Sequence, residues 1–199
     1  KISINGIESN AIGAENAGAV AAKFTIDGVL SYPYNVVYPA ASANEVTFLA
    51  KQSYAEGTFA QGVAPMYGYA ESAANVIQMH HLAGALKYQI TMGDKTSDLH
   101  SIRRIELWGN NNEQMAGDFV IDYQTATLTA AGTNAESKVV VEINKDQVEG
   151  SVVTVFAVVP AIEYTKGITV RLIDKAGHYM DLASKAMTIE KGEIKAMPV

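Results

Sequence analysis

The sequence predicts an all-β protein, an antiparallel β-sandwich, and three observations predict it. About a dozen short segments alternate apolar with polar residues, at the spacing of roughly 8–12 residues that is typical of sandwiches. Gly, Pro, Asn and Asp separate these segments, as expected of turns. No helical segments alternate regularly with the strands, which disfavours a parallel α/β fold.

The longest apolar and β-branched run occupies residues 150–160, between Gly150 and Pro160. It is rich in Val, and it is too short for a typical core helix. A strand that is buried on both faces has this composition, and Pro160 would end it. We therefore expect these residues to form the central strand of the last sheet.

The N-terminal part predicts short strands and loops. Residues 1–7 alternate as a half-buried strand, and residues 9–22, rich in Ala, Asn and Gly, indicate a loop. Residues 23–28 alternate again and end in Asp-Gly, the strongest short signal for a hairpin. Residues 29–32 would then return as its second strand.

The next two Tyr- and Pro-rich segments predict irregular structure. Residues 33–43 contain two Tyr-Pro pairs and are expected to form an extended connection. Residues 46–50 form a strand. Residues 51–72 carry three Gly and one Pro among their aromatic residues, which indicates a long surface segment held by aromatic packing.

Residues 75–91 fit two patterns. Leu82, Leu86 and Ile90 have helical spacing, whereas Leu86, Tyr88 and Ile90 also alternate with polar residues as in a strand. A strand is favoured because strong strand patterns surround this segment.

From residue 101 onward the alternation is regular. Strands are expected at residues 101–108, 119–124, 126–130, 139–144, 167–173, 178–182, 186–190 and 193–199. Residues 144–150 resemble a capped single turn of helix, with Gly150 closing it. We expect one β-sandwich region over residues 1–199, with a subdivision near residues 72–76 into parts 1–74 and 75–199.

Composition excludes several classes of function. The formal net charge is −6 and the pI about 5.2, so a nucleic-acid partner is disfavoured because phosphate binding needs a basic field. There is no Cys, which excludes disulfides and thiolate chemistry. No apolar run is long enough for a membrane span, and no signal peptide is recognisable, so one is expected to be absent or removed.

No motif predicts an enzyme or a metal site, so neither catalytic residues nor a cofactor are expected. The sequence lacks G-x-S-x-G, the P-loop and G-x-G-x-x-G. The adjacent His80 and His81 would point to opposite faces of a strand, so a shared metal is disfavoured. Glu106 and Asp122 could form a carboxylate pair of glycosidase type, but surface residues are the favoured interpretation.

Acidic clusters do not fit a calcium loop. Asp94 with Asp98, and Asp118 with Asp122, lack the remaining ligands of an EF-hand. We interpret the first pair as a solvated turn and the second as an outward strand face.

The ten Tyr residues lie mostly in the first half of the chain. Packing of loops is the favoured interpretation. The alternative is a contact surface for a carbohydrate or a protein, because exposed Tyr is enriched in recognition sites. Tyr67 and Tyr69 are the candidate ligand contacts.

The order of several segments resembles the fimbrillin-like proteins of Bacteroides and its relatives. The matching segments span roughly residues 23–194 and are residues 36–40, 62–66, 79–86, 102–117, 117–122, 157–160, 167–170, 177–179 and 189–194. Residues 79–86, Met-His-His-Leu-Ala-Gly-Ala-Leu, resemble the F-x-H-x-L-A-x-L region of that family.

This resemblance implies a transthyretin-like β-sandwich and a non-catalytic fimbrial (pilus) subunit or cell-adhesion protein. Such subunits are exported lipoproteins that stay attached to the outer membrane, at the cell surface. They assemble when an extended segment of a neighbouring subunit adds to an open groove. The expected partners are therefore neighbouring subunits or a host surface ligand.

The chain departs from the family pattern in two respects. It lacks the lipobox Cys, so a lipid anchor would belong to the full-length precursor, and it is shorter than subunits that continue into a second sandwich. A truncated region, an anchor or tip subunit and a non-polymerising adhesin remain open. The alternative function is a monomeric glycan- or protein-binding module that uses the Tyr-rich N-terminal half.

Overall fold

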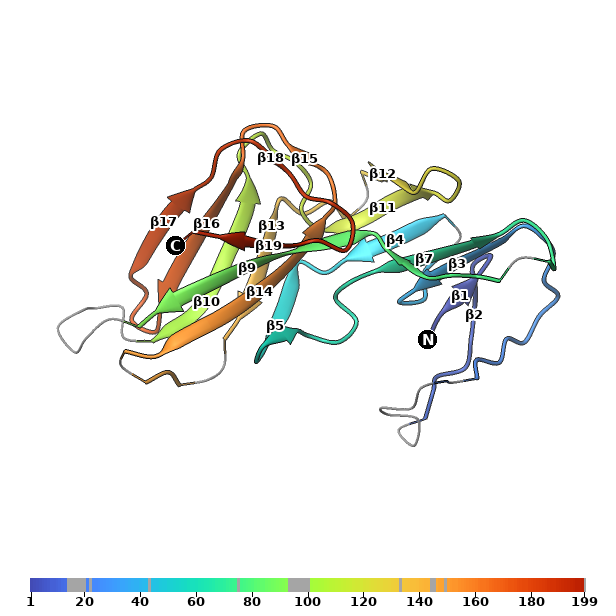
Figure 1. Cartoon of the computed structure of the whole chain (residues 1–199), viewed down its shortest axis with the longest axis horizontal. Helices are drawn as coiled ribbons and strands as arrows, with labels where there is room; N and C mark the ends of the chain where they lie inside the picture. Colours follow the sequence, from blue (N-terminus) through green and yellow to red (C-terminus); the bar gives the residue numbers. More distant parts are fainter. Residues whose placement is uncertain are drawn as a thin grey trace.

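A computed structural model gives the fold, which is an elongated assembly of β-strands (Figure 1). The structure describes residues 1–13, 21, 23–42, 44–74, 76–92, 101–132, 134–143, 146–148 and 150–198. These residues form strands, turns and bends and contain no helix. The described residues therefore include no helix that could span a membrane. The prediction of an all-β fold is confirmed.

The strands follow one another throughout the described chain. They are β1 (Ser3–Ile4), β2 (Ile7–Glu8), β3 (Tyr34–Tyr38), β4 (Glu45–Phe48), β5 (Lys51–Ala55), β6 (Thr58–Phe59), β7 (Met66–Ala70), β8 (His80–His81), β9 (Ala83–Thr91), β10 (Ile102–Gly109), β11 (Gly117–Asp122), β12 (Thr127–Ala130), β13 (Lys138–Glu142), β14 (Val152–Pro160), β15 (Glu163–Tyr164), β16 (Ile168–Asp174), β17 (Tyr179–Ala183), β18 (Met187–Thr188) and β19 (Ile194–Met197).

Two sheets pack face to face to form the sandwich. One has six strands in the order β17-β16-β10-β13-β5-β6, and the other has three in the order β14-β9-β19. Most neighbours are antiparallel, but β5 pairs with β13 and β19 with β9 in parallel. Alternate residues of β9 and β14, such as Leu86 and Val155, are fully buried between the sheets.

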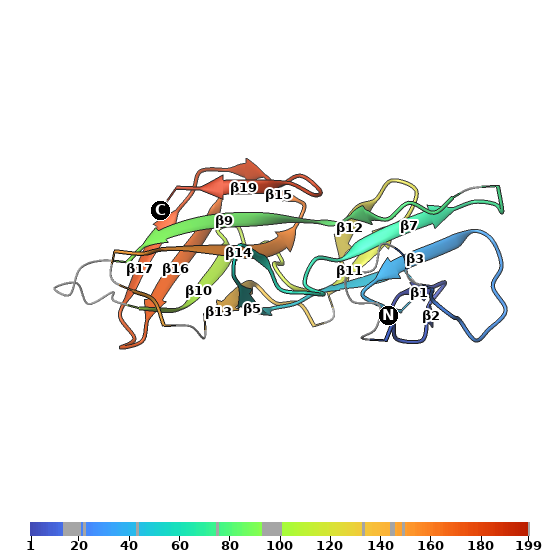
Figure 2. The same cartoon turned by 60° about the horizontal axis from the view of Figure 1, so that its bottom comes forward.

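Two of the remaining sheets extend the molecule away from the sandwich (Figure 1). The five-stranded sheet β2-β1-β3-β7-β8 lies towards the end opposite the C-terminus (Figure 2). A three-stranded sheet, β12-β11-β4, lies beside it, and β15 and β18 form a separate pair. Residues 1–74 therefore supply strands to three sheets, because β5 and β6 belong to the sandwich. The subdivision near residues 72–76 stays a prediction.

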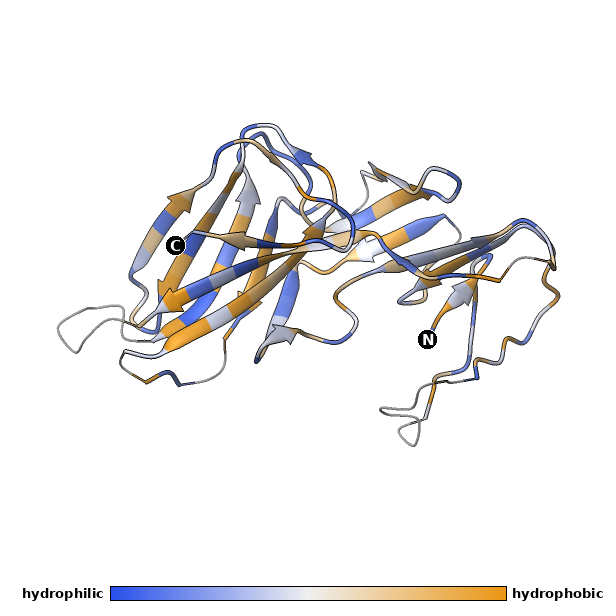
Figure 3. Cartoon of the chain, viewed as in Figure 1, coloured by the Kyte–Doolittle hydropathy of each residue, from blue (hydrophilic) through white to orange (hydrophobic). Residues whose placement is uncertain are grey.

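The apolar run at residues 150–160 forms a strand, as predicted, but not the central one. In its sheet β9 is central and β14 is an edge strand (Figure 1). Most of β14 is nevertheless buried and hydrophobic (Figure 3). Its side chains are covered on both faces by neighbouring layers, whereas its backbone pairs on one side only. The hydrophobicity of the side chains therefore predicts their burial and does not predict how the backbone is paired.

Both segments predicted as irregular contain strands. Residues 33–43 include β3, which Pro33 and Pro39 bracket without removing a donor from its interior. Residues 51–72 include β5, β6 and β7. Gly57 and Gly62 have φ of 73° and 79° and lie in turns between these strands. The Gly residues therefore mark the ends of strands and do not indicate a continuous loop.

The hairpin predicted at Asp27-Gly28 is wrong. Ile26 forms only an isolated bridge with Ser9, and residues 29–32 are not a strand. The strand interpretation of residues 75–91 is confirmed by β8 and β9. Residues 144, 145 and 149 of the predicted helical turn lie outside the described residues, and the described residues 146–148 form no helix. Most of the loop predicted at residues 9–22 also lies outside the described residues, as do Asp94 and Asp98.

Candidate functional site

Tyr67 and Tyr69 lie on the same face of β7, separated by the buried Gly68. Both are partly buried and pack against the hydrophobic core. Their rings are therefore held in position while part of each ring stays accessible, as a ligand contact requires.

The two rings line a hollow of about 230 Å³. The Tyr67 ring lies 5.8 Å from the His80 ring and 6.4 Å from the Tyr123 ring, measured between centroids. Burial raises the pKa of the Tyr123 phenol, so this group stays protonated and keeps its donor at neutral pH. The remaining lining residues are Val76 and Gln78.

Pairing with β7 positions the wall of this hollow. Tyr67 faces His80 across the antiparallel ladder between β7 and β8. On the other face of β7, a Cβ atom built on Gly68 would lie 2.5 Å from Ile77 Cγ2 and 3.0 Å from the Gln78 carbonyl oxygen. The absence of a side chain at Gly68 therefore lets residues 77–78 lie directly against the strand.

A second hollow of about 360 Å³ lies next to the first and shares lining residues with it. Tyr67 and His80 line both, and the second is completed by Met79, His81, Lys191 and Gly192. Its volume falls within the range of about 300–1,000 Å³ that is usual for small-molecule sites. We call the two hollows together the aromatic groove.

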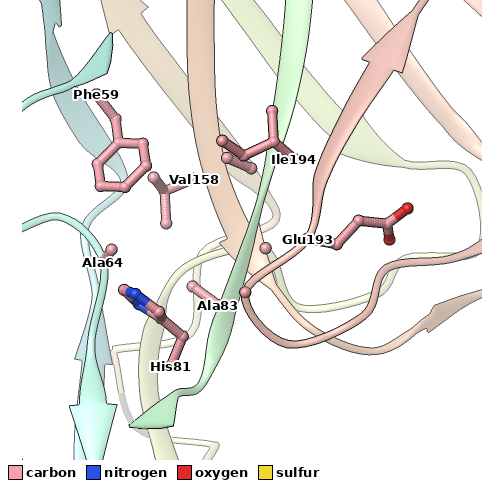
Figure 4. A pocket seen from close by; sticks show the side chains of 10 residues that line it. Phe59, Ala64, His81, Ala83, Val158, Glu193 and Ile194 are labelled. Carbon is pink, nitrogen blue, oxygen red and sulfur yellow. The ribbon is translucent and has the colours of Figure 1, made fainter. Parts of the chain in front are cut away.

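A smaller pocket lies on the face of the β14-β9-β19 sheet that is turned away from the six-stranded sheet (Figure 4). Phe59, Val158 and Ile194 surround an apolar space of about 120 Å³, and the Glu193 carboxylate points away from Phe59 and Val158. Because this volume is below the usual range for ligands, the pocket suits a single apolar side chain at most.

The second candidate feature is the outer edge of β14. The side chain of Gln52 on β5 accepts a hydrogen bond from the Val158 N–H (3.0 Å) and donates one to the Val158 carbonyl (2.7 Å). Farther along, Tyr164 Oη and Ile162 N–H donate to the Pro160 carbonyl, at 3.1 and 3.0 Å. These groups close the C-terminal half of the edge.

The N-terminal half of this edge is open only in the sense that its outward backbone groups are unpaired among the described residues, because β5 and β6 lie near β14 and Phe156 is 9% exposed. Thr154 and Phe156 have the same orientation as Val158, because alternate residues of a strand point their N–H and C=O groups to the same side. No hydrogen bond from another described residue reaches these groups on the outer side of β14. They offer two donors and two acceptors to an added strand.

A hollow of about 200 Å³ lies at this end of β14. It is lined by Tyr54, Glu56, Ile143, Asp146, Gln147, Val148, Ser151, Val152 and Val153. Val148 and Val152 are 73% and 56% exposed, so the hollow has an apolar rim. An extended segment beside Thr154 and Phe156 would place alternate side chains there.

The other residues considered from the sequence are engaged locally. Glu106, on β10, forms ion pairs with Arg104 at 2.8 Å and Lys138 at 3.5 Å. Asp122, on β11, accepts hydrogen bonds from the backbone of the following turn. In the part of the chain that the structure describes, no three His, Asp or Glu side chains are grouped to hold a metal ion.

Sequence reasoning selected Tyr67 and Tyr69 but missed the rest of the groove. The sequence indicates His80 only as a possible metal ligand, because its pairing with Tyr67 depends on a strand at residues 66–70 that the Tyr- and Gly-rich composition conceals. Tyr123 and Lys191 come from distant strands and turns, and no local pattern links them to Tyr67. The open edge of β14 was missed because its hydrophobicity suggested a central strand.

No protein-family profile and no curated protein matches the sequence. Among solved structures, the chain is similar to a candidate cell adhesion protein from Bacteroides ovatus, with 8% identity and a TM-score of 0.48. A candidate cell adhesion protein from Bacteroides uniformis gives 14% identity and a TM-score of 0.47.

The two alignments cover 84% and 78% of this chain, and 66% and 62% of the other chains. The chain thus spans less than two thirds of the length of either structure. Its functional assignment therefore depends on the geometry of the β14 edge and the aromatic groove.

Proposed function

We propose that this chain is a non-catalytic subunit of a cell-surface fimbria or adhesin of fimbrillin type, which assembles by strand addition. An extended segment of a neighbouring subunit pairs with the open half of the β14 edge. In this proposal the full-length precursor carries the lipid anchor that attaches the assembly to the outer membrane.

The observation that carries the proposal is the unpaired backbone of Thr154 and Phe156 beside an apolar-rimmed hollow. Strand addition draws its affinity from main-chain hydrogen bonds and its specificity from side-chain pockets. Both are available at this edge. In the closed half, the Gln52 amide already bonds the N–H and the carbonyl of Val158. The added strand would therefore end before Val158.

The test is assembly of the full-length precursor after treatment with a trypsin-like protease, followed by negative-stain microscopy. Thr154→Pro removes the outward N–H and leaves the ladder to β9 intact, since Pro is tolerated where an edge strand faces away from its partner. Thr154→Val is the matched control, because it keeps the N–H. We expect polymers from the wild type and from Thr154→Val, and none from Thr154→Pro.

Hydrogen exchange locates the contact. We expect the amides of Thr154 and Phe156 to exchange rapidly in the monomer and slowly in the polymer, whereas Val153 and Val155 stay protected in both. A wild type that remains monomeric counts against assembly. Polymers with unchanged exchange at Thr154 and Phe156 would place the subunit contact elsewhere.

A second candidate function is recognition of a glycan or a host protein through the aromatic groove. It is favoured by the partly accessible rings of Tyr67 and Tyr69 beside His80 and Gln78. The test is a glycan array together with binding to host surface proteins, for the wild type and for Tyr67→Ala and Tyr69→Ala.

Tyr179→Ala is the control, because Tyr179 is 60% exposed and lies on β17 outside the groove. We expect binding to be lost in both groove variants and retained in the control. The absence of any ligand for the wild type, or equal binding by all variants, removes this second function.

A further inference from the structure

Lys191 lies at the end of the aromatic groove on a turn that is fixed to the sandwich. Glu193 N–H donates to the Glu190 carbonyl at 3.1 Å, and Glu190 N–H donates to Glu193 Oε2 at 3.0 Å. Gly192 N–H donates to the Ala83 carbonyl, and Ala85 N–H to the Glu193 carbonyl, both at 2.8 Å on β9. The position of the Lys191 backbone is therefore set by the sheet.

The nearby carboxylate of Glu193 is already engaged. It accepts the Glu190 N–H and lies 3.1 Å from the Lys195 ammonium. These contacts lower the pKa of Glu193, which stays ionised and paired. Lys191 forms no hydrogen bond or ion pair with any other described residue, and it is exposed.

The groove therefore differs in charge from the rest of the molecule. The chain has a formal net charge of −6, yet neither hollow of the groove is lined by an Asp or Glu. Lys191 is the one Lys or Arg among the described lining residues. A negative group that enters the groove meets a cation and no lining carboxylate.

The rest of the lining suits a ring that carries hydroxyl groups. The Tyr67 and Tyr69 rings offer flat apolar faces, against which the C–H groups of a pyranose can pack. The Gln78 amide and the Tyr69 phenol offer both donors and acceptors to a ligand, whereas the Tyr123 phenol is buried and bonded to the Asn44 backbone. A hydroxyl-rich ligand uses such groups more fully than an apolar peptide side chain would.

We propose that the aromatic groove binds an acidic saccharide, with a pyranose ring against Tyr67 and its carboxylate at Lys191. This inference rests on the recognition function proposed above and names the class of its ligand. The charged contact selects acidic over neutral sugars, while the aromatic rings supply affinity that both kinds of sugar share.

The experiment measures, by calorimetry, binding of four glycans and of the acidic peptide oligo-glutamate to the wild type, Lys191→Gln and Lys185→Gln. The acidic probes are oligogalacturonate and 3′-sialyllactose, and their neutral counterparts are the carboxyl-reduced forms of the same two glycans. Lys185 is the matched control, because it is also exposed but lies outside the groove. Thermal unfolding of each variant verifies that the fold is kept.

We expect the wild type to bind at least one acidic probe about tenfold more tightly than its neutral counterpart, since a charge-assisted hydrogen bond is lost with the carboxylate. Lys191→Gln should reduce acidic binding to the neutral level, and Lys185→Gln should change neither. Added salt should weaken only the acidic complex.

Three other results overturn the inference, and they differ in what they leave standing. Equal affinity for acidic and neutral sugars, unchanged in Lys191→Gln, keeps glycan recognition but removes the selection for acids. Binding of an acidic peptide such as oligo-glutamate, without any sugar, assigns the groove to a protein ligand. Binding of none of these probes, with a hit elsewhere on the array, leaves recognition in place for another ligand class.

Discussion

At the scale of single residues, a few buried polar side chains join elements that the hydrophobic pattern alone could not hold in place. Gln52 is 4% exposed, and its amide satisfies both backbone groups of Val158 across the gap between β5 and β14. It takes the role of a neighbouring strand for one residue. The sequence offers no sign of this, because a single Gln in an alternating segment is predicted to be exposed.

We expect Gln52→Ala to lower the free energy of unfolding by about 2–4 kcal/mol, because a buried N–H and a buried C=O lose their partners. Chemical denaturation measures the loss. Lys51→Ala, at the exposed neighbouring position, should change stability by less than about 0.5 kcal/mol. Equal stability of both variants would mean that water replaces the amide.

Asp174 provides the second prediction at this scale. The carboxylate is 2% exposed and accepts hydrogen bonds from the His178 backbone N–H at 2.8 Å and from its ring at 2.9 Å. Burial raises the pKa of Asp174, but the bonds from His178 and Gly177 outweigh it and hold the pKa below the ordinary value of 3.8. The ionised form therefore stabilises the fold above this pH.

This contribution is complete above the unfolded-state pKa and is lost as the pH falls through the lower folded-state value. We expect Asp174→Asn to lower the melting temperature at pH 7 and to differ less from the wild type near about pH 3. Melting curves across this range test it. A difference that is constant with pH would show that the charge of Asp174 contributes nothing.

At the scale of elements, backbone pairing and side-chain burial are separate properties, and the sequence reports mainly the second. Alternation correctly predicted most strands from residue 101 onward, and it favoured a strand at residues 75–91 over a helix. It misplaced β14 within its sheet. The strands β3, β5 and β7 were not predicted, because the Tyr, Pro and Gly residues in and around them are typical of loops.

Only a small part of the candidate site could be predicted from the sequence. The clustering of Tyr residues identified Tyr67 and Tyr69, whereas His80, Tyr123 and Lys191 join them only through pairing between distant segments. Such pairing depends on register, and register is fixed by the packing of the whole sheet.

A substitution at Gly68 tests whether close packing of residues 77–78 on β7 holds the groove wall in place. An added methyl group would lie too close to Ile77 Cγ2 and to the Gln78 carbonyl, so residues 77–78 must move away. We expect Gly68→Ala to cost about 1–3 kcal/mol in unfolding free energy and to weaken any ligand of the groove. Gly132→Ala is unsuitable as a control, because its φ of 76° adds backbone strain.

A better comparison is Ala70→Gly, at the other buried position on the same face of β7. It removes a methyl group and leaves residues 77–78 in place. It should therefore destabilise the fold without altering ligand affinity. If Gly68→Ala and Ala70→Gly affect binding equally, the groove wall does not depend on the close approach at Gly68.

At the scale of the whole molecule, the order of strands along the chain differs from their order in space. Residues 1–74 supply β5 and β6 to the edge of the six-stranded sheet, and β5 pairs in parallel with β13. Phe48, which is 1% exposed, also comes from this part and contacts Phe119 of β11, with 5.1 Å between ring centroids. The two halves of the sequence thus share one hydrophobic core.

We therefore expect residues 75–199, produced alone, to lack a cooperative unfolding transition. The fragment would lose β4, β5 and β6, expose Val141 of β13 and leave Val158 without Gln52. Thermal melts followed by near-ultraviolet circular dichroism measure this, with residues 1–199 as the reference. Adding residues 1–74 as a separate fragment should restore the transition, because β5 can then pair with β13 again. A fragment 75–199 that melts cooperatively by itself would contradict the shared core and would support two independently folding parts divided near residues 72–76.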